Sequence, residues 1–173
     1  MPSGYTIVNS LPADIGTIFQ LFDSAIAYQE KHNYPLWPRF SRAFILEEIS
    51  EKRHWKIVWN DTIVCIFSVM YTDPVIWGKE QDAEPSVYLH RIAVHPQFKG
   101  RNMMLLVKEW AREHAVQNGK RFVRMDTWGH NWNLRRYYIG CGFDYLGQRH
   151  LEQRENEPAH YGGSILSLFQ LKV

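Results

Sequence analysis

The residues from Ser86 to Met104, SVYLHRIAVHPQFKGRNMM, are the stretch best suited to binding an anionic ligand. They begin as a β-rich run, turn at Pro96, cross a short basic loop and enter an amphipathic helix near Met103. The first N–H groups of a helix have no intrahelical acceptors, and the helix dipole favours negative charge there. A strand that leads onto a helix N-terminus therefore predicts a phosphate-binding site.

The charge distribution favours an anionic ligand in the same part of the chain. Residues 86–125 include eight Lys and Arg residues and two acidic residues, a net charge of +6, whereas the whole chain carries +2. A concentrated positive field attracts anions, although a solvated helix face with ordinary ion pairs would explain the same charges. The basic residues form no dense tract and match no nucleic-acid motif, so no nucleic-acid partner is expected.

Length and composition are those of a single globular domain over residues 1–173. No window offers the roughly 18 uninterrupted apolar residues of a membrane span, so no membrane partner is expected. The N-terminus does not read as a signal peptide, and Cys65 and Cys141 lie in apolar contexts typical of buried free thiols, so a reducing cytoplasm is expected. No Cys or His cluster has zinc spacing, and no metal is expected.

The elements that must position the loop predict a mixed fold. The expected strands are Tyr5–Asn9, Trp55–Trp59, Thr62–Thr72, Ser86–Val94, Arg121–Thr127, Phe143–Gln153 and Gly163–Lys172. The expected helices run from a cap at Ser10 to about Lys31, from a cap at Ser41 to about Lys52, from about Met103 to Asn118, and over Asn131–Ile139. This order predicts an α+β (mixed α/β) fold: a central, mostly antiparallel twisted sheet of six to seven strands, one parallel β-α-β pair, and helices on both faces.

Three connections have their own signals. Asn60-Asp61 between two β-rich runs predicts a hairpin turn. Tyr34–Phe40 carries two prolines and three aromatic residues, so it is expected to be a loop that either plugs the core or walls a substrate pocket. Asp73–Pro85 is polar and contains proline, and is expected to be an exposed loop.

The loop region resembles the GNAT superfamily of acyl-CoA-dependent N-acyltransferases. That family has a strand ending in Val-x-Pro, then a loop of the form Q/R-x-x-G-x-G/A, then a helix; here IAVHP at 92–96 is followed by KGRNMM at 99–104. In this register Asn102 and Met104 replace the two family glycines. A register that starts at Gln97 keeps one glycine but breaks the spacing from Val94. Asparagine tolerates left-handed backbone and methionine does so poorly, so the exchanges bear on phosphate binding.

A second pattern of the same family is better preserved. The family has Asn, a Tyr seven residues later, and Gly-Phe four and five residues after the Tyr. This chain has Asn131, Tyr138, Gly142 and Phe143 at that spacing. The resemblance therefore implies an acetyl-CoA-dependent N-acetyltransferase of GNAT-like fold, with acetyl-CoA as cosubstrate.

The resemblance also implies where coenzyme A binds. The backbone of Ile92, Ala93 and Val94 would lie along the pantetheine arm, and an N–H near Val94 would polarise the acyl carbonyl. Asn131 and Tyr138 would contact the cosubstrate. The pyrophosphate would accept hydrogen bonds from backbone N–H groups from Gly100 to Met104 and would be attracted by the charged side chains of Lys99 and Arg101. The loop residues expected to bind it are Lys99, Gly100, Arg101, Asn102, Met103 and Met104.

Transfer of an acyl group from a thioester to an amine needs a proton for the leaving thiolate and a base for the amine. The resemblance implies that Tyr138 protonates the leaving thiolate. The alternative is that Tyr138 is only an aromatic residue of the core, and Tyr137 lies one residue out of register with the family pattern. His90, on the strand of Val94, or Asp126, at the end of the next strand, would be the base; a water chain is the third possibility. Glu47 and Glu48 are weaker candidates and are expected to be solvated.

The acceptor pocket is assigned from loop position alone, to Trp37, Arg39 and Trp128. The expected acceptor is a small-molecule amine or a peptide amine, and a homodimer is expected only from the resemblance. Two alternatives stay open: a catalytically weak acyl-CoA-binding or sensing module, which the lost glycines favour, and an acyltransferase for a different acyl chain or acceptor.

Overall fold

The structure is a computed structural model that describes residues 4–151 and 163–173. It divides into two compact units, the first formed by residues 1–69 and 90–107 and the second by residues 70–89 and 108–173. We describe each unit by itself, and the expected single domain stays a prediction. One strand, Ser86–Val94, and one helix, Met103–Gln117, contribute residues to both units.

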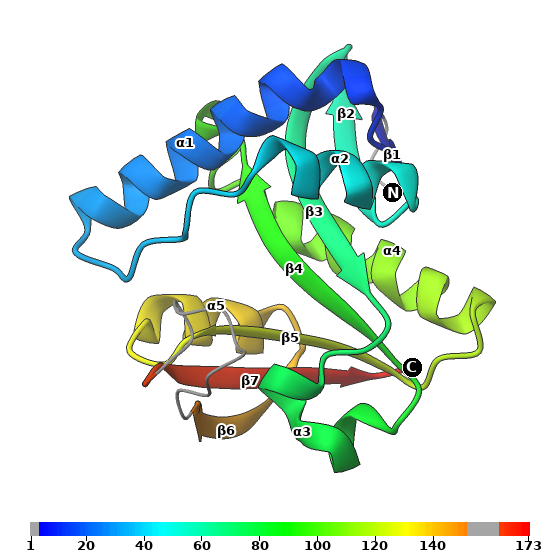
Figure 1. Ribbon diagram of the computed structural model, residues 1–173, viewed down its shortest axis with the longest axis vertical. Helices are drawn as coiled ribbons and strands as arrows, with labels where there is room; N and C mark the ends of the chain where they lie inside the picture. The colour runs from blue at the N-terminus through cyan, green and yellow to red at the C-terminus, as the bar shows by residue number, and fades with distance from the viewer. Residues whose placement is uncertain (1–3, 152–162) are drawn as a thin grey trace. The chain divides into compact units, whose positions relative to one another are not determined.

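The strands within the described residues form one sheet in the order β1-β2-β3-β4-β5-β7-β6 (Figure 1). Their bounds are Tyr5–Asn9 for β1, His54–Trp59 for β2, Thr62–Met70 for β3, Ser86–Val94 for β4, Phe122–Trp128 for β5, Asp144–His150 for β6 and Ile165–Lys172 for β7. β4 and β5 pair in parallel, whereas β1–β2, β2–β3, β5–β7 and β6–β7 are antiparallel. The predicted fold class is confirmed.

Five α-helices and two 3-10 turns lie between these strands in the described part of the chain. They are η1 (Pro12–Asp14), α1 (Ile15–Lys31), α2 (Arg42–Ser50), α3 (Pro74–Asp82), η2 (Pro96–Phe98), α4 (Met103–Gln117) and α5 (Trp132–Gly140). Each expected strand and helix is present, with ends that differ by a few residues. The end of the expected strand Phe143–Gln153 and the segment between it and Gly163 lie outside the described residues.

In the first unit, α1 and α2 pack on β3 and β4 through a buried apolar cluster. Its members include Ile18 and Phe22 of α1, Ile45 of α2, Ile66 of β3 and Ala93 of β4. The apolar positions of α1 recur at helical spacing, which gives that helix one buried face. β2 and β3 are joined by the predicted turn at residues 60–61, both of which adopt positive φ.

The predicted cap at Ser10 is wrong. Helix α1 is preceded by the 3-10 turn η1, where the Leu11 N–H donates to Asp14 Oδ2 at 2.7 Å. Ser10 is instead buried, its N–H donates to the His54 carbonyl at 3.0 Å, and its Oγ lies 2.8 Å from His54 Nδ1. The pairing of β1 with β2 brings the Ser10 hydroxyl next to His54, 44 positions away, and no local sequence pattern predicts such a contact.

We expect His54 to make the stability of the protein depend on pH. Burial lowers the pKa of His54 to about 4, and the charge of Arg91 acts in the same direction. The His54 imidazole therefore becomes protonated near pH 6.5 in the unfolded chain but only near pH 4 in the folded chain. Stability is therefore full above pH 6.5 and falls as the pH drops towards 4, by a total on the order of 3 kcal/mol.

Urea unfolding at pH 7.0, 5.5 and 4.5 measures this dependence. His54→Asn is expected to flatten the slope relative to the unmodified chain, whereas the exposed His32→Asn leaves it unchanged. Parallel slopes for the chain and its His54 variant would show that another group carries the effect.

In the second unit, the segment expected to be an exposed loop at Asp73–Pro85 is helix α3, which corrects that prediction. Asp73 Oδ1 accepts from the Ile76 N–H at 3.3 Å, and Pro74 occupies the first turn, where its missing N–H costs nothing. Ile76 and Trp77 are buried in a cluster that includes Tyr88. The Asp73-Pro74 pair is a sequence signal for the start of a helix. A helix of nine residues with two buried side chains, however, has no clear helical periodicity of apolar residues.

Arg124 of β5 is buried in the second unit and tied to several neighbours. Its Nε donates to Gln170 Oε1 at 2.9 Å and its Nη1 to Tyr88 Oη at 3.3 Å. It also donates to the Gln81 carbonyl and to the Glu84 carboxylate. The guanidinium thus connects α3 and the segment after it to the sheet.

Both cysteines are buried and free, as expected. No helix among residues 4–151 and 163–173 has the length and apolar character to cross a membrane.

Candidate active site

The predicted pantetheine-binding strand is the C-terminal half of β4 in the first unit. Ala93 is buried in the cluster under α1 and α2, whereas Ile92 and Val94 are half-buried. The next residue, His95, donates its N–H to the Val64 carbonyl of β3 at 2.9 Å. The ladder between β4 and β5 joins only Ser86–Leu89 to Phe122–Met125, so the residues after Leu89 lie beyond it.

The predicted phosphate loop begins with the 3-10 turn η2, capped by His95, whose Nδ1 accepts from the Gln97 N–H at 3.3 Å. Gly100 then has φ 78° and Asn102 has φ 55°. Asparagine is among the few residues that adopt the left-handed region readily. The chain therefore keeps at Asn102 a conformation that glycine usually supplies.

Helix α4 follows directly, and Met103 and Met104 are buried in its first turn. Met104 lies in helical backbone, so the missing glycine demands no left-handed methionine. The Arg101 N–H is used by the loop itself, because it donates to the Phe98 carbonyl at 3.2 Å. Gly100, Asn102, Met103 and Met104 supply the other amides of the predicted set, and the last three lie at a helix start, where amides have no intrahelical acceptor.

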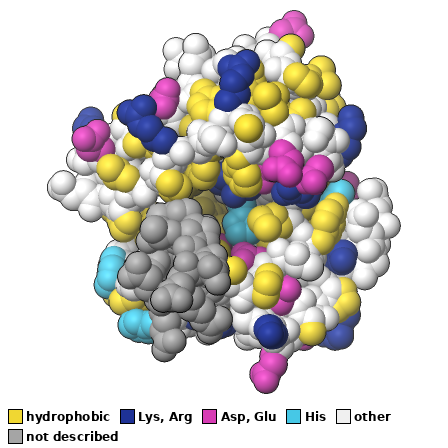
Figure 2. Space-filling model, viewed as in Figure 1, with side chains coloured by type: hydrophobic (Ala, Val, Ile, Leu, Met, Phe, Trp, Pro, Cys, Tyr) yellow, Lys and Arg dark blue, Asp and Glu magenta, His cyan; other side chains and the backbone are white. Residues whose placement is uncertain are grey.

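The two cations of the loop lie over aromatic rings. Lys99 Nζ is 3.5 Å from the ring centroid of Tyr28, and the Arg101 guanidinium carbon is 4.7 Å from that of Phe98. Both residues are exposed, and partial desolvation lowers the pKa of Lys99. On the face drawn in Figure 2, the Lys and Arg side chains of the described residues are scattered among acidic ones.

The second predicted pattern lies in the second unit, on α5. Asn131 caps this helix, because its Oδ1 accepts from the Leu134 N–H at 3.0 Å. Arg135 Nη2 donates to the Gly129 carbonyl at 3.1 Å, which ties the helix to the loop before it. The Arg135 guanidinium carbon also lies 4.0 Å from the ring centroid of Trp132 and 4.5 Å from that of Tyr145. Asn131 thus starts a well-anchored helix.

Tyr138 and its neighbour Tyr137 differ in burial. Tyr138 is 9% exposed, and its ring packs edge-on against Phe169 with centroids 5.3 Å apart. Tyr137 is 39% exposed. Burial raises the pKa of the Cys141 thiol, while a hydrogen bond with Tyr137 acts in the opposite direction. The helix therefore presents the predicted acid and its out-of-register neighbour to different surroundings.

The two candidate bases are both half-buried on strands. His90 belongs to β4 in the first unit, and Asp126 to β5 in the second, where it lies opposite Leu168 of β7. The choice between them stays a prediction.

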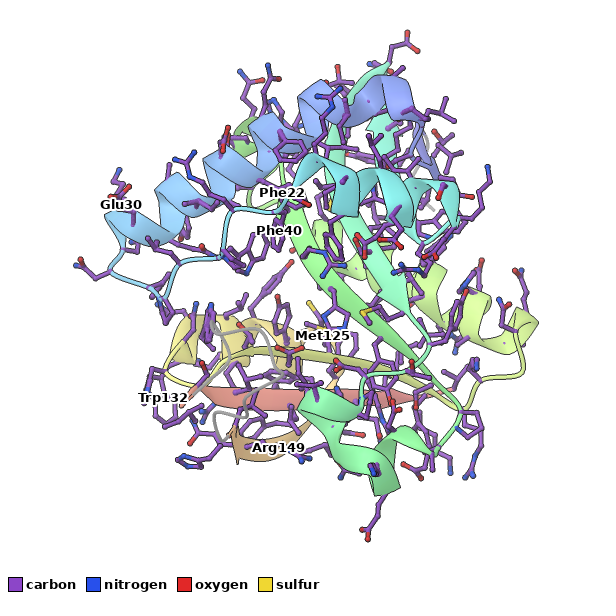
Figure 3. All side chains as sticks on the ribbon, in the orientation of Figure 1. Phe22, Glu30, Phe40, Met125, Trp132 and Arg149 are labelled. Carbon is purple, nitrogen blue, oxygen red and sulfur yellow. The ribbon has the colours of Figure 1, made fainter. Side chains whose placement is uncertain are left out.

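The three predicted pocket residues have different surroundings. Trp37 packs against the apolar cluster of the first unit, with its ring centroid 6.1 Å from that of Phe22 and 6.1 Å from that of Phe40. Figure 3 labels these two phenylalanines, which lie on α1 and on the loop before α2. Arg39 is exposed, and Trp128 packs against the cluster of the second unit. The aromatic loop at residues 34–40 thus contributes to the core, and its part in an acceptor pocket stays a prediction.

Glu48 was expected to be solvated, and that expectation is wrong. Its side chain is fully buried on α2 and accepts from Ser68 Oγ at 2.8 Å and from Arg53 Nη1 at 3.2 Å. It also forms an ion pair with Arg91 of β4. These partners lie 5 to 43 positions away in the sequence, so only the packing of α2 on the sheet reveals them.

Comparison with known proteins finds no family model that matches the chain. A curated relative, the Bacillus subtilis (strain 168) protein named uncharacterized N-acetyltransferase YesJ, is 31% identical over 75 residues, which are 43% of this chain. The matched region spans 41% of the length of that relative.

Solved structures match nearly the whole chain. An acetyltransferase of the GNAT family from Streptococcus agalactiae 2603 has a TM-score of 0.74 at 20% identity, covering 99% of this chain and 96% of its own. The Salmonella typhimurium protein yncA, solved with its cofactor acetyl-CoA, has a TM-score of 0.69 at 15% identity, covering 98% and 94%. At these identities the likeness shows the fold.

Proposed function

The chain has the GNAT fold, and on this premise we propose that it is an acyltransferase that moves an acetyl group from acetyl-CoA to a primary amine. The observation that carries the proposal is the loop before α4, where Gly100 and Asn102 are both left-handed. This conformation supports a backbone cradle for a pyrophosphate at a helix N-terminus. The Asn131–Tyr138–Gly142–Phe143 spacing is the second support.

In the proposed complex, the pyrophosphate accepts hydrogen bonds from the N–H groups of Gly100 and of residues 102–104. The Arg101 N–H is excluded from that set, since it donates to Phe98. The pantetheine arm runs along Ile92–Val94. Asn131 uses Oδ1 for its helix cap, so its contact with the cosubstrate would be made through Nδ2.

The proposed reaction is a direct attack. The amine nitrogen forms a C–N bond to the acetyl carbon while the C–S bond of the thioester breaks, and an N–H near Val94 stabilises the developing oxyanion. Tyr138 gives its phenolic proton to the thiolate of coenzyme A. A base takes the proton that the amine loses, and His90, Asp126 or a water chain fills that role.

The pH dependence of kcat/KM tests which group is the base. If His90 is the base, His90→Ala is expected to change the shape of the pH profile and to lower kcat/KM by roughly 10²-fold. Asp126→Asn is the matched variant for the second candidate. An unchanged profile in His90→Ala would move the role to Asp126 or to water.

The alternative of a catalytically silent acyl-CoA-binding module loses its main support. It was favoured by the replaced glycines, but Asn102 keeps the left-handed backbone and Met104 is helical. Both alternatives use this loop to bind acyl-CoA, and the retained Tyr138 at the acid position favours the enzyme. A small or peptide amine acceptor, a homodimer and a cytoplasmic location stay predictions.

Two measurements test the proposal. Isothermal titration with acetyl-CoA is expected to show one site of micromolar affinity, and free-thiol release with a panel of amines is expected to show turnover. The absence of binding at millimolar acetyl-CoA would overturn the proposal. Binding without turnover by any amine would favour the module.

A further inference from the structure

Arg91 has an unusual backbone conformation for a strand residue. Its φ is 51°, in the left-handed region, although it lies within β4. An L-residue with a Cβ pays a steric penalty there, whereas glycine does not. Arg91 comes two residues after Leu89, where the ladder with β5 ends, and directly before Ile92–Val94. Whatever holds this residue left-handed therefore sets the direction of the strand that follows.

The Arg91 side chain is anchored on α2 and the loop before it. The guanidinium forms an ion pair with Glu48 of α2, and its carbon lies 5.1 Å from the ring centroid of Phe44 and 5.7 Å from that of Phe40. The side chains of Arg91 and Glu48 are 12% and 0% exposed. A buried carboxylate is stable only when it is paired, so Glu48 fixes the guanidinium in one place.

We infer that Glu48 and Arg91 are positioning residues for acyl transfer. Their ion pair holds Arg91 left-handed, and the resulting kink re-aims the N–H groups of Ile92–Val94 towards the pantetheine arm and the acyl carbonyl. Neither side chain touches the reacting atoms. This inference rests on the proposed function and adds to it a device that couples α2 to the strand carrying the oxyanion donor.

Glycine and alanine at position 91 separate backbone conformation from charge. Arg91→Ala removes the anchor but keeps a Cβ, so the strand is expected to relax towards regular β geometry. Arg91→Gly removes the same anchor but adopts φ near 51° without strain. In both variants Glu48 keeps Arg53 and Ser68 as partners. We expect kcat to be about tenfold higher in Arg91→Gly than in Arg91→Ala.

Glu48→Gln is expected to lower kcat about tenfold, because the ion pair is lost, and the double variant Glu48→Gln with Arg91→Gly is expected to recover most of that loss. Arg53→Ala is the matched control, since it removes the other cation on Glu48 without touching β4. It is expected to lower the melting temperature and leave kcat unchanged. Circular dichroism of every variant shows whether the fold is kept.

The outcomes separate this inference from the proposed function. If the unmodified chain neither binds acetyl-CoA nor turns over, the proposed function fails, and the inference falls with it. If the unmodified chain is active but Arg91→Gly and Arg91→Ala have equal kcat, the positioning role is overturned. A Glu48→Gln variant that loses stability at unchanged kcat would likewise reduce the pair to a structural role.

Discussion

Replacing Tyr138 by phenylalanine is expected to lower kcat by a factor of about 10² to 10⁴. In the proposed reaction the phenol supplies the proton that the departing thiolate needs, and phenylalanine cannot. The ring of Tyr138 packs against Phe169 at 5.3 Å, and phenylalanine keeps that contact, so the fold is expected to persist. Steady-state thiol release with a good amine acceptor measures the effect, and the loss is expected in kcat more than in the KM for acetyl-CoA.

Tyr137→Phe provides the control for this experiment. Tyr137 precedes Tyr138 on the same helix and is 39% exposed, so removal of its hydroxyl is expected to change kcat less than twofold. The two variants make the same chemical change at neighbouring residues of one helix, one in the predicted register and one outside it. The acid assignment would be wrong if Tyr138→Phe turned over at the rate of the unmodified chain, or if both variants slowed equally.

Arg124→Met is expected to lower the free energy of unfolding by about 3 kcal/mol. The guanidinium is 1% exposed and donates to Gln170, Tyr88, the Gln81 carbonyl and Glu84. Methionine fills much of the volume but leaves those acceptors without their donor. Glu84 is 43% exposed and can be solvated, so the penalty falls on the buried Tyr88 hydroxyl and on the part-buried oxygens of Gln170 and Gln81 rather than on the lost ion pair.

Urea unfolding followed by circular dichroism measures this effect. Arg121→Met is the control, because Arg121 lies just before the same strand but is exposed, and its substitution is expected to cost less than about 0.5 kcal/mol. A loss below about 1 kcal/mol for Arg124→Met would mean that the network contributes little beyond packing.

Local patterns in the sequence were enough for most elements of the fold. Helix α1 has a long apolar period, and the turn at residues 60–61 has its own residue signature, so each could be read from a short window. Helix α3 was not predicted, because its nine residues include only two buried side chains and a glycine with φ 73°. Its Asp73–Pro74 start was visible, and a prediction weighted towards helix caps would have found it.

Some features of the candidate site likewise have a local sequence signal, whereas others depend on residues far apart in the chain. The loop at 99–104 and the spacing from Asn131 to Phe143 are local features, so the sequence alone determined that a phosphate-binding loop and a GNAT-like helix were expected. The burial of Glu48 and its pairing with Arg91 depend on residues 43 positions apart. Only the packing of α2 on the sheet brings them together, because burial and ion pairing depend on distances between side chains that no short window contains.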